Sequence, residues 1–178
     1  KRPRSWTVGL IHAANLIKTG TADNFFISRE LDSRLTSVHC PVGMFTSPAV
    51  KNPIIAALDV PNAEEALKLA EAIAPAVGAF KIGKELFVSA GPDIVKRVRD
   101  TGAAVFLDLK FHDIPNTVAK AVASAVRLDV QMLTVHTCGG TAMLQAAVKA
   151  AGDGPLVLGV TVLTSMDEND LTEVGVQQ

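Results

Sequence analysis

Five short apolar runs recur along the chain from about residue 52 onward, and amphipathic stretches separate them. The runs cover 54–60, 79–83, the first half of 103–117, 130–136 and 156–164. Strands of a parallel sheet that is covered by helices carry continuous apolar sequence rather than a strict apolar–polar alternation. The pattern therefore predicts five buried parallel strands.

The stretches between these runs are typical of helices. Asn62 followed by Glu65 is a capping-box pattern, which begins a helix that extends to about residue 74. Pro92 suits the first turn of a second helix, which Gly102 ends. Two further helices are predicted over 116–127 and 141–151. Helices that alternate with apolar strands in this way predict an α/β fold with a parallel sheet.

Polar side chains recur where the predicted strands end. These residues are Asp59, Lys81, Asp108, Lys110, His136 and Thr164. Barrels of parallel strands and open doubly wound sheets both bind ligands at the carboxyl edge of their strands. The Gly-rich fingerprint of dinucleotide-binding sheets does not follow the first strand, where Asp59-Val60-Pro61-Asn62 stands instead. A TIM (β/α)8 barrel is therefore the favoured architecture.

Residues 1–50 follow a different pattern. They contain the only tryptophan, Trp6, and keep neither a helical nor a strand period for long. The basic start is typical of a transit peptide, whereas Asp23 and Glu30 argue against one. A second explanation is that translation begins at Met44. We therefore divide the chain into an N-terminal extension over 1–50, outside the native fold, and a partial barrel domain over 51–178.

The composition is that of a packed globular domain, because 48% of the residues are hydrophobic and 20% are charged. The net charge of -1 provides no basic field for nucleic acid or for an anionic membrane. No apolar run approaches the roughly 18 residues that span a bilayer. Cys40 and Cys138 are far apart and indicate free thiols in a reducing compartment. We expect a cytoplasmic protein with neither nucleic-acid nor membrane partners.

The stretch 103–117 concentrates charge at the end of its apolar run. Side chains alternate along a strand, so Asp108 and Lys110 are expected on one face, with Leu107 and Leu109 on the other. Buried charges cost roughly several kcal/mol unless they are paired, so this arrangement needs compensation from its neighbours or from a function. Taken alone, an Asp-x-Lys pair at a strand end is usually a solvated pair at the rim of the sheet.

Residues 108–117, D-L-K-F-H-D-I-P-N-T, resemble the signature D-x-K-x-x-D-I-P-N-T of the orotidine 5'-phosphate decarboxylase family in its bacterial form. Four further segments resemble that family: A-L-D at 57–59, F-K-I-G at 80–83, T-V-H at 134–136 and V-T-V-L-T-S at 160–165. The resemblance implies a TIM barrel truncated here to about five βα units. The family's phosphate-binding arginine and closing loop would belong to a C-terminal part that this chain lacks.

The resemblance also implies a reaction, the decarboxylation of orotidine 5'-monophosphate to uridine 5'-monophosphate in pyrimidine biosynthesis, without a cofactor or a metal. Lys110 would protonate carbon 6 of the pyrimidine, and Asp108 would lie against the departing carboxylate. Lys81 and Asp113 would complete an alternating Lys-Asp-Lys-Asp array. The residues that would bind substrate are Asp59, Lys81, Asp108, Ile114, Pro115, Thr117 and Thr164. The family forms homodimers, in which Asp113 and Thr117 would reach the neighbouring subunit's site.

Two other interpretations stay open. A related decarboxylase or aldolase acting on a sugar phosphate would share D-x-K-x-x-D and use Mg²⁺, but the I-P-N-T continuation speaks against it. An inactive, truncated chain would act only as a binding module, through the unpaired edge of its fifth strand or through its N-terminal extension. His112 and His136 are given no catalytic role, because a structural or solvent-facing histidine is the commoner case at such positions.

Overall fold

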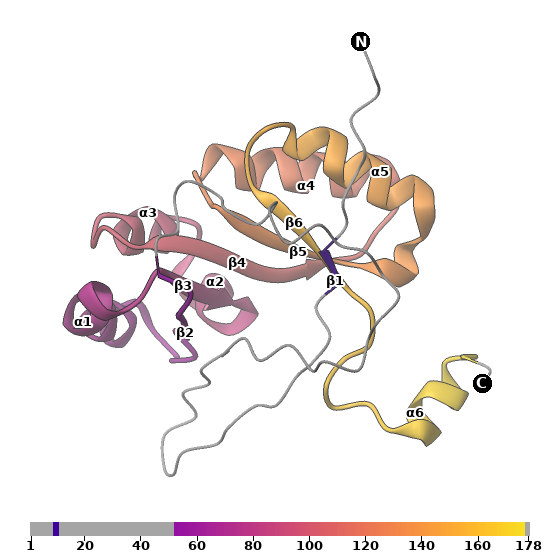
Figure 1. Ribbon diagram of the computed structural model, residues 1–178, viewed down its shortest axis with the longest axis horizontal. Coiled ribbons are helices and arrows are strands. Elements are labelled where there is room, and N and C mark those ends of the chain that lie inside the picture. The colour runs from indigo at the N-terminus through magenta and orange to yellow at the C-terminus, as the bar shows by residue number, and fades with distance from the viewer. Residues whose placement is uncertain (1–8, 11–51, 177–178) are drawn as a thin grey trace.

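A parallel sheet forms the centre of the computed structural model, which describes residues 9–10 and 52–176 (Figure 1). Its strands are β1 Gly9–Leu10, β2 Ile55–Ala57, β3 Ala79–Gly83, β4 Ala104–Phe111, β5 Met132–His136 and β6 Leu156–Val160. They are hydrogen-bonded in the order β1-β6-β5-β4-β3-β2, and every pair is parallel. From β2 to β6, each strand therefore lies beside the strands that precede and follow it in the chain.

This strand order distinguishes the two architectures that the sequence pattern allows. A doubly wound sheet reverses its strand order at a switch point, whereas the strands of a TIM barrel follow one another around the barrel. The order from β2 to β6 contains no reversal. The five parallel strands and their helices thus form part of a TIM barrel, as predicted.

Helices connect the strands. In the described part of the chain they are α1 Ala63–Ile73, α2 Lys84–Ala90, α3 Asp93–Arg99, α4 Pro115–Arg127, α5 Gly140–Ala151 and α6 Glu168–Glu173, with 3₁₀ turns η1 Ala74–Ala76 and η2 Thr137–Gly139. The four helices expected from the sequence are all present. Helices α2 and α6 were not expected; α2 follows β3 directly and has no side-chain cap at its start.

The start of α1 follows from its first residues. Asn62 is the N-cap, and its side-chain oxygen accepts a hydrogen bond from the Glu65 backbone N–H at 3.0 Å. Asn62 Nδ2 donates to Glu65 Oε1 at 2.7 Å, which holds the two side chains together. One of the N–H groups that the first helical turn leaves unpaired is satisfied in this way. The helix therefore begins where the capping pattern predicts.

Alternate positions of the strands form the core with the helices. The buried core residues on the strands, or directly after β2 in the case of Leu58, are Ala56, Leu58, Phe80, Ile82, Val105, Leu107, Leu133 and Val135. Val118 and Val122 of α4 and Met143 and Ala147 of α5 belong to the same core. Figure 1 shows α4 and α5 side by side along the sheet. Because side chains alternate along a strand, the remaining strand positions face away from these helices.

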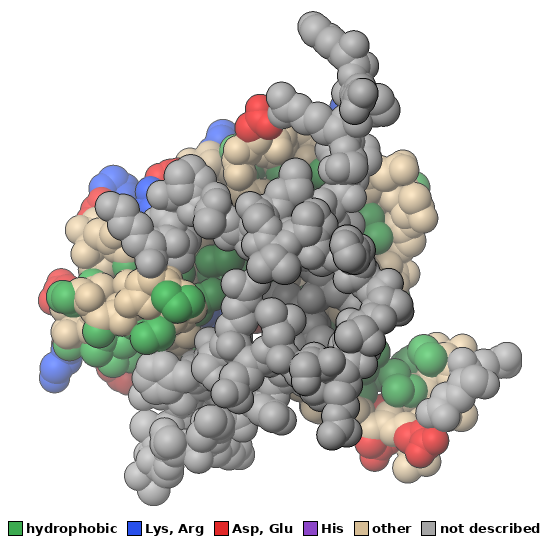
Figure 2. Space-filling model, in the orientation of Figure 1, with side chains coloured by type: hydrophobic (Ala, Val, Ile, Leu, Met, Phe, Trp, Pro, Cys, Tyr) green, Lys and Arg blue, Asp and Glu red, His purple; other side chains and the backbone are tan. Residues whose placement is uncertain are grey.

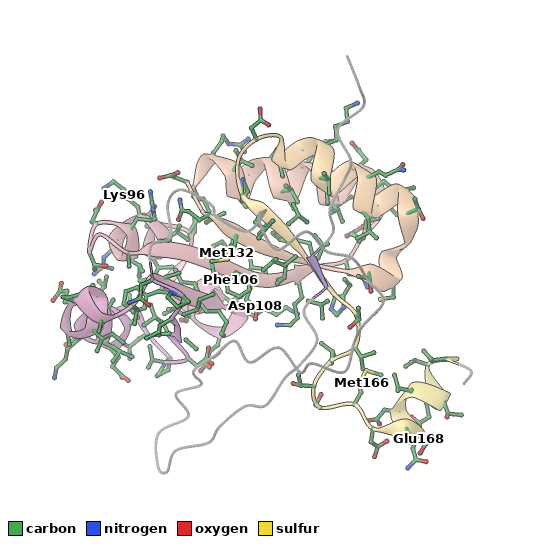
Figure 3. All side chains as sticks on the ribbon, in the orientation of Figure 1. Lys96, Phe106, Asp108, Met132, Met166 and Glu168 are labelled. Carbon is green, nitrogen blue, oxygen red and sulfur yellow. The ribbon has the colours of Figure 1, made fainter. Side chains whose placement is uncertain are left out.

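The face of the sheet opposite the core carries the charged strand residues. One row across β2 to β6 consists of the register partners Ala57, Lys81, Phe106, Met132 and Leu156. Asp108 and Thr134 follow Phe106 and Met132 on the same face, nearer the carboxyl ends of β4 and β5. Figure 3 shows Phe106, Asp108 and Met132 along this part of the sheet. Lys81 and Asp108 therefore lie on the face of the sheet opposite the helices, with Asp108 nearer the carboxyl edge.

Strand β6 is shorter than the predicted run 156–164. Its last register pair joins Val160 to His136, where β5 ends and the chain turns into η2. Among the described residues, β5 offers no register partner beyond Val160, because the chain turns into η2 after His136. Thr164 is therefore exposed in a turn beyond the strand, and its predicted place at a strand end is wrong.

The outer edge of β6 is paired over two positions. Gly9 lies opposite Leu158 and Leu10 opposite Gly159, in a parallel ladder between β1 and β6. The expectation of an unpaired edge is wrong there, because a segment from the first fifty residues supplies the neighbouring strand. Residues 1–8 and 11–50 lie outside the described residues, so the division of the chain at residue 50 stays a prediction.

Helix α6 stands away from the sheet at the C-terminal end of the chain (Figure 1). Its surface in Figure 2 carries acidic and hydrophobic side chains. The two valines that follow it, Val174 and Val176, are 66% and 50% exposed. Neither α6 nor any other helix among the described residues has the length and apolar composition of a membrane span.

Candidate active site

The centre of the candidate site is an ion pair between neighbours on β4. Lys110 Nζ lies 2.8 Å from Asp108 Oδ2 and donates a hydrogen bond to it. The side chains are 28% and 14% exposed, so water reaches the lysine more than the carboxylate. Leu107 is buried in the core and Leu109 packs against it. The contact predicted between Asp108 and Lys110 is therefore present, with the leucines on the core side.

A bulge in β4 lies at the same residues. Leu107 pairs with Leu133, but the next register pair is Phe111 with Val135, so β4 advances by more residues than β5 does. Lys110 takes up part of this excess with a left-handed backbone, at a φ of 53°. A bulge re-aims the side chains around it, and bulges are frequent beside active sites. The register between β4 and β5 is therefore irregular at Lys110, although Asp108 and Lys110 stay in contact.

Thr134 of β5 faces this bulge. Its hydroxyl donates a hydrogen bond to Asp108 Oδ1 at 2.9 Å. Thr134 Oγ1 in turn accepts a hydrogen bond from the Lys110 backbone N–H, also at 2.9 Å. Thr134 is 2% exposed and is the buried polar side chain of the described residues. One threonine thus contacts both the carboxylate and the backbone of the Asp108–Lys110 pair.

A second ion pair lies on β3 and just after β2. Lys81 Nζ donates to Asp59 Oδ1 at 2.8 Å, and the two side chains are 18% and 34% exposed. The Leu58 backbone N–H donates to the Lys81 carbonyl at 2.9 Å, which extends the β2–β3 pairing to the residue before Asp59. Lys81 therefore has Asp59 as its carboxylate partner, and its place with Asp113 in the predicted Lys-Asp-Lys-Asp array stays a prediction.

The remaining predicted site residues lie in loops or in the first turn of α4. Asp113 Oδ1 accepts a hydrogen bond from the Ile114 backbone N–H at 2.6 Å. Pro115 is the first residue of α4, and Thr117 is exposed in its first turn. Within the described part of the chain, no ion pair or side-chain hydrogen bond joins Asp113, Thr117 or Thr164 to the Asp108–Lys110 or Lys81–Asp59 pairs. Their roles in a site stay predictions.

Two histidines and a cysteine lie near one another just after β4 and at the end of β5. The rings of His112 and His136 are 5.5 Å apart and tilted by 45°. Cys138 Sγ is 4.0 Å from His112 Nδ1. Burial lowers the pKa of His136 below its ordinary value, and the charges of His112, Lys84 and Lys110 lower it further, against an opposing effect of Asp108. Burial and these charges together therefore favour the neutral form of His136.

The arrangement of the Asp108–Lys110 pair suits proton transfer. An ammonium group held by a carboxylate in a partly buried setting keeps a proton at a fixed place, which suits a general acid. Among the described residues, no group of three or more His, Cys, Asp or Glu side chains is arranged to hold a metal ion. The charged groups of the site are thus two lysines and two aspartates in adjacent pairs, Lys110–Asp108 and Lys81–Asp59.

Sequence reasoning gave Thr134 no role, although it is the residue that links the two members of the central pair. The signal in the sequence is a single hydroxyl within the apolar run M-L-T-V-H at 132–136. The period of two places Thr134 on the face of His136, at the polar edge of the sheet. Its partners cannot be read from this pattern, because they lie 24 and 26 residues away along the chain.

Relatives of known name match the barrel part of the chain. A family model described as "Orotidine 5'-phosphate decarboxylase / HUMPS family" matches residues 52–178. The orotidine 5'-phosphate decarboxylase of Methylacidiphilum infernorum is 52% identical over 123 residues, which cover 68% of this chain and 54% of the relative. That of Syntrophotalea carbinolica is 50% identical over 136 residues, 72% of this chain and 56% of the relative. The chain therefore spans about half the length of the curated relatives it matches.

Solved structures show the same similarity. The crystal structure of orotidine 5'-phosphate decarboxylase from Lactobacillus acidophilus superposes with a TM-score of 0.60 at 34% identity, covering 69% of this chain and 58% of that one. The orotidine 5'-monophosphate decarboxylase of Methanocaldococcus jannaschii, complexed with inhibitor BMP, gives a TM-score of 0.52 at 31% identity, over 55% of this chain and 45% of that one. Together with the strand order, these similarities and the family match lead to one conclusion: the chain belongs to the orotidine 5'-phosphate decarboxylase / HUMPS family.

Proposed function

We propose that this protein converts orotidine 5'-monophosphate to uridine 5'-monophosphate and carbon dioxide, with Lys110 as the proton donor. The observation that carries the proposal is the ion pair between Lys110 and Asp108, 2.8 Å long, at the carboxyl edge of the sheet. It stands at the head of the segment D-L-K-F-H-D-I-P-N-T. The family match and the curated relatives, which bear the name of this activity, support the same reaction.

Lys110 matches the chemical demand of a direct decarboxylation. The bond between pyrimidine carbon 6 and the carboxylate carbon breaks, and its electron pair stays on carbon 6 while carbon dioxide leaves. A fixed ammonium beside that carbon stabilises the developing negative charge. Lys110 Nζ then gives one proton to carbon 6, a C–H bond forms, and the neutral amine regains a proton from water. No oxidant or reductant takes part in this sequence.

Asp108 would act on the carboxylate side of the reaction. Its side chain is the less exposed member of the central pair, at 14%. A substrate carboxylate bound against it would meet a like charge in a poorly hydrated place, and the repulsion would be relieved when carbon dioxide leaves. Asp108 also holds the Lys110 ammonium in place, because its Oδ2 accepts a hydrogen bond from Lys110 Nζ at 2.8 Å.

The Lys81–Asp59 pair would hold the sugar of the substrate. A carboxylate at the carboxyl edge accepts hydrogen bonds from ribose hydroxyls, and Lys81 fixes Asp59 through a contact of 2.8 Å. Ile114, Pro115, Thr117 and Thr164 would complete the nucleotide contacts. The Methanocaldococcus jannaschii relative, which was solved with inhibitor BMP, supports a ligand site in proteins of this fold.

The proposal includes a cytoplasmic homodimer with shared active sites. Asp113 would enter the neighbouring subunit's site, and Thr117 would join the ribose contacts there. Asp113 is exposed, and the adjacent Ile114 is 66% exposed. A partner subunit that covered Ile114 would remove this apolar surface from water. A pyrimidine-synthesis role is consistent with free thiols in a reducing compartment.

The test is a decarboxylation assay on the protein translated from the complete reading frame that encodes this sequence. Release of carbon dioxide from orotidine 5'-monophosphate is measured with and without a chelator, and uridine 5'-monophosphate binding is measured by calorimetry. We expect turnover that the chelator does not change. Turnover that needs added Mg²⁺ would support the sugar-phosphate alternative instead. Folded protein that neither turns over the substrate nor binds the product would overturn the proposal.

A further inference from the structure

Thr134 occupies the position on β5 that faces the bulge of β4. The register pairs on either side of it are Leu133 with Leu107 and Val135 with Phe111. The surplus residues of β4 between these pairs include Asp108 and Lys110. Regular pairing between backbones cannot continue across such a bulge. The Lys110 backbone N–H instead donates to the Thr134 hydroxyl oxygen, at 2.9 Å.

The hydroxyl also closes a ring of hydrogen bonds around the proposed proton donor. The Lys110 backbone N–H donates to Thr134 Oγ1, and the Thr134 hydroxyl donates to Asp108 Oδ1. The other carboxylate oxygen, Asp108 Oδ2, accepts from Lys110 Nζ at 2.8 Å and so returns the ring to the same lysine. One hydroxyl uses its donor and one acceptor position here, so it serves both the backbone and the side-chain end of the pair.

Because Thr134 is buried, the loss of either of its hydrogen bonds would be unfavourable. Thr134 is 2% exposed, and water cannot replace either of its contacts. A buried hydroxyl is unfavourable unless it is hydrogen-bonded, and a buried N–H or carboxylate oxygen that loses its partner is unfavourable as well. The left-handed backbone of Lys110, with a φ of 53°, is a conformation that surrounding contacts must hold in place. The Thr134 hydroxyl is such a contact.

We infer that Thr134 is a positioning residue for the decarboxylation: it holds the Lys110 backbone and the Asp108 carboxylate in the geometry that aims the ammonium at pyrimidine carbon 6. This inference rests on the proposed function. Thr134 does not touch the substrate, and it acts through the two residues that do. Its loss therefore lowers the rate of the chemical step and leaves the contacts to the sugar, made by the Lys81–Asp59 pair, in place.

The experiment compares Thr134→Val, which keeps the shape and removes the hydroxyl, with Thr134→Ser, which keeps the hydroxyl. Thr101→Val is the matched control, because the Thr101 hydroxyl donates to the Val98 carbonyl at 2.7 Å at the end of α3, outside the site. We expect kcat of Thr134→Val to fall by about tenfold to a hundredfold, with KM changed by less than about threefold. Thr134→Ser and Thr101→Val are expected to keep wild-type kcat.

A second measurement does not depend on turnover. Hydrogen exchange of the Lys110 amide is followed by NMR in the same variants. Loss of its acceptor should speed this exchange by about tenfold or more in Thr134→Val, and Thr134→Ser should restore the protection. If Thr134→Val does not fold, Thr134→Cys replaces it, because a thiol is a weaker donor and acceptor of similar size. We then expect the same two changes, each smaller in size.

The outcomes separate the two levels of inference. A wild-type protein without turnover overturns the proposed function, whereas the amide exchange still decides whether Thr134 holds Lys110. Wild-type turnover together with an unchanged kcat in the folded Val or Cys variant overturns the positioning role. A raised KM at unchanged kcat, or a loss that Thr134→Ser does not restore, would overturn it too, because substrate binding or general packing would then explain the effect.

Discussion

Lys110 Nζ and Asp108 Oδ2 lie 2.8 Å apart within the bulge of β4, and the backbone of Lys110 is left-handed there, with a φ of 53°. A left-handed conformation costs a residue with a Cβ about 1–2 kcal/mol. The cost is offset by the ion pair and by the Thr134 hydroxyl, which accepts from the Lys110 N–H. Strained backbone held by surrounding contacts is typical of functional positions, where it aims a particular side chain. The geometry of Lys110 is therefore consistent with a role as the aimed ammonium of the site.

Replacing Lys110 tests this role directly. We expect Lys110→Ala to lower turnover by at least about 10⁴-fold, because it removes both the proton donor and the charge that stabilises the carbanion. Nucleotide binding should stay within about tenfold, because Asp59 and Lys81 remain. Steady-state kinetics and calorimetry with uridine 5'-monophosphate measure the two effects.

Two further variants serve as controls for Lys110→Ala. Lys110→Gly removes the same side chain and suits the left-handed backbone, so it should be as inactive as the alanine variant and at least as stable. Lys120→Ala changes an exposed lysine of α4 and should keep wild-type activity. Turnover near that of the wild type in Lys110→Gly would remove Lys110 from its assigned role.

The Lys81–Asp59 pair is expected to stabilise the fold more than an exposed pair does. Its side chains are 18% and 34% exposed, whereas those of the Lys96–Asp100 pair in α3 are 80% and 62% exposed. Double-mutant cycles with Lys→Met and Asp→Asn changes should give a coupling of about 1–2 kcal/mol for the first pair and below about 0.5 kcal/mol for the second. Urea unfolding measures both. Equal couplings would show that partial burial does not strengthen the Lys81–Asp59 contact.

The strand and helix order could be predicted because each element carries its own signal. The apolar run 79–83 and the Asn62 cap are local, and both elements appear where the pattern predicts them. Helix α2 was missed because its seven residues follow β3 with no capping side chain. Strand β1 was missed because its two residues acquire strand structure by pairing with β6, and that partner is far away in the sequence.

The contacts of the candidate site were likewise predictable only where they depend on local sequence. The contact between Asp108 and Lys110 follows from their spacing along one strand and could be predicted. The bulge that aims Lys110 could not, because it depends on the register between β4 and β5 and on the hydroxyl of Thr134. The pairing of Lys81 with Asp59 likewise depends on the register of β2 against β3. Pairings set by register are visible only once the strands are assembled.

Stability should fall below pH 6.5 through His136. Burial and the charges of His112, Lys84 and Lys110 lower the pKa of His136 below its ordinary value of 6.5. Well above that pH the ring is neutral in both the folded and the unfolded chain. As the pH falls below 6.5, the unfolded chain binds a proton that the folded protein does not, so unfolding becomes more favourable. The decline from this group ends once the pH is below its pKa in the folded protein.

The contribution of His136 is isolated by comparison with His136→Asn. Unfolding free energies from urea titrations at pH 7.5 and pH 5.5 should differ more in the wild type than in the variant, because carboxylates contribute equally to both proteins. NMR titration of the ring should give a pKa below 6.5. The same loss of stability in wild type and variant would show that His136 does not couple folding to pH.

Mixing inactive variants tests whether Asp113 serves a neighbouring subunit. If each site takes Lys110 from one subunit and Asp113 from the other, Lys110→Ala and Asp113→Ala homodimers are both impaired. A mixed dimer then has one site with both changes and one intact site. At equal concentrations half of the dimers are mixed, so activity should recover to about a quarter of the wild-type value.

The exposed Asp113 and Ile114 are consistent with such an exchange. Refolding the two variants together, with differently tagged chains to isolate the mixed dimers, measures the recovery. Isolated mixed dimers that stay as inactive as their parents would mean that Asp113 acts within its own subunit or not at all.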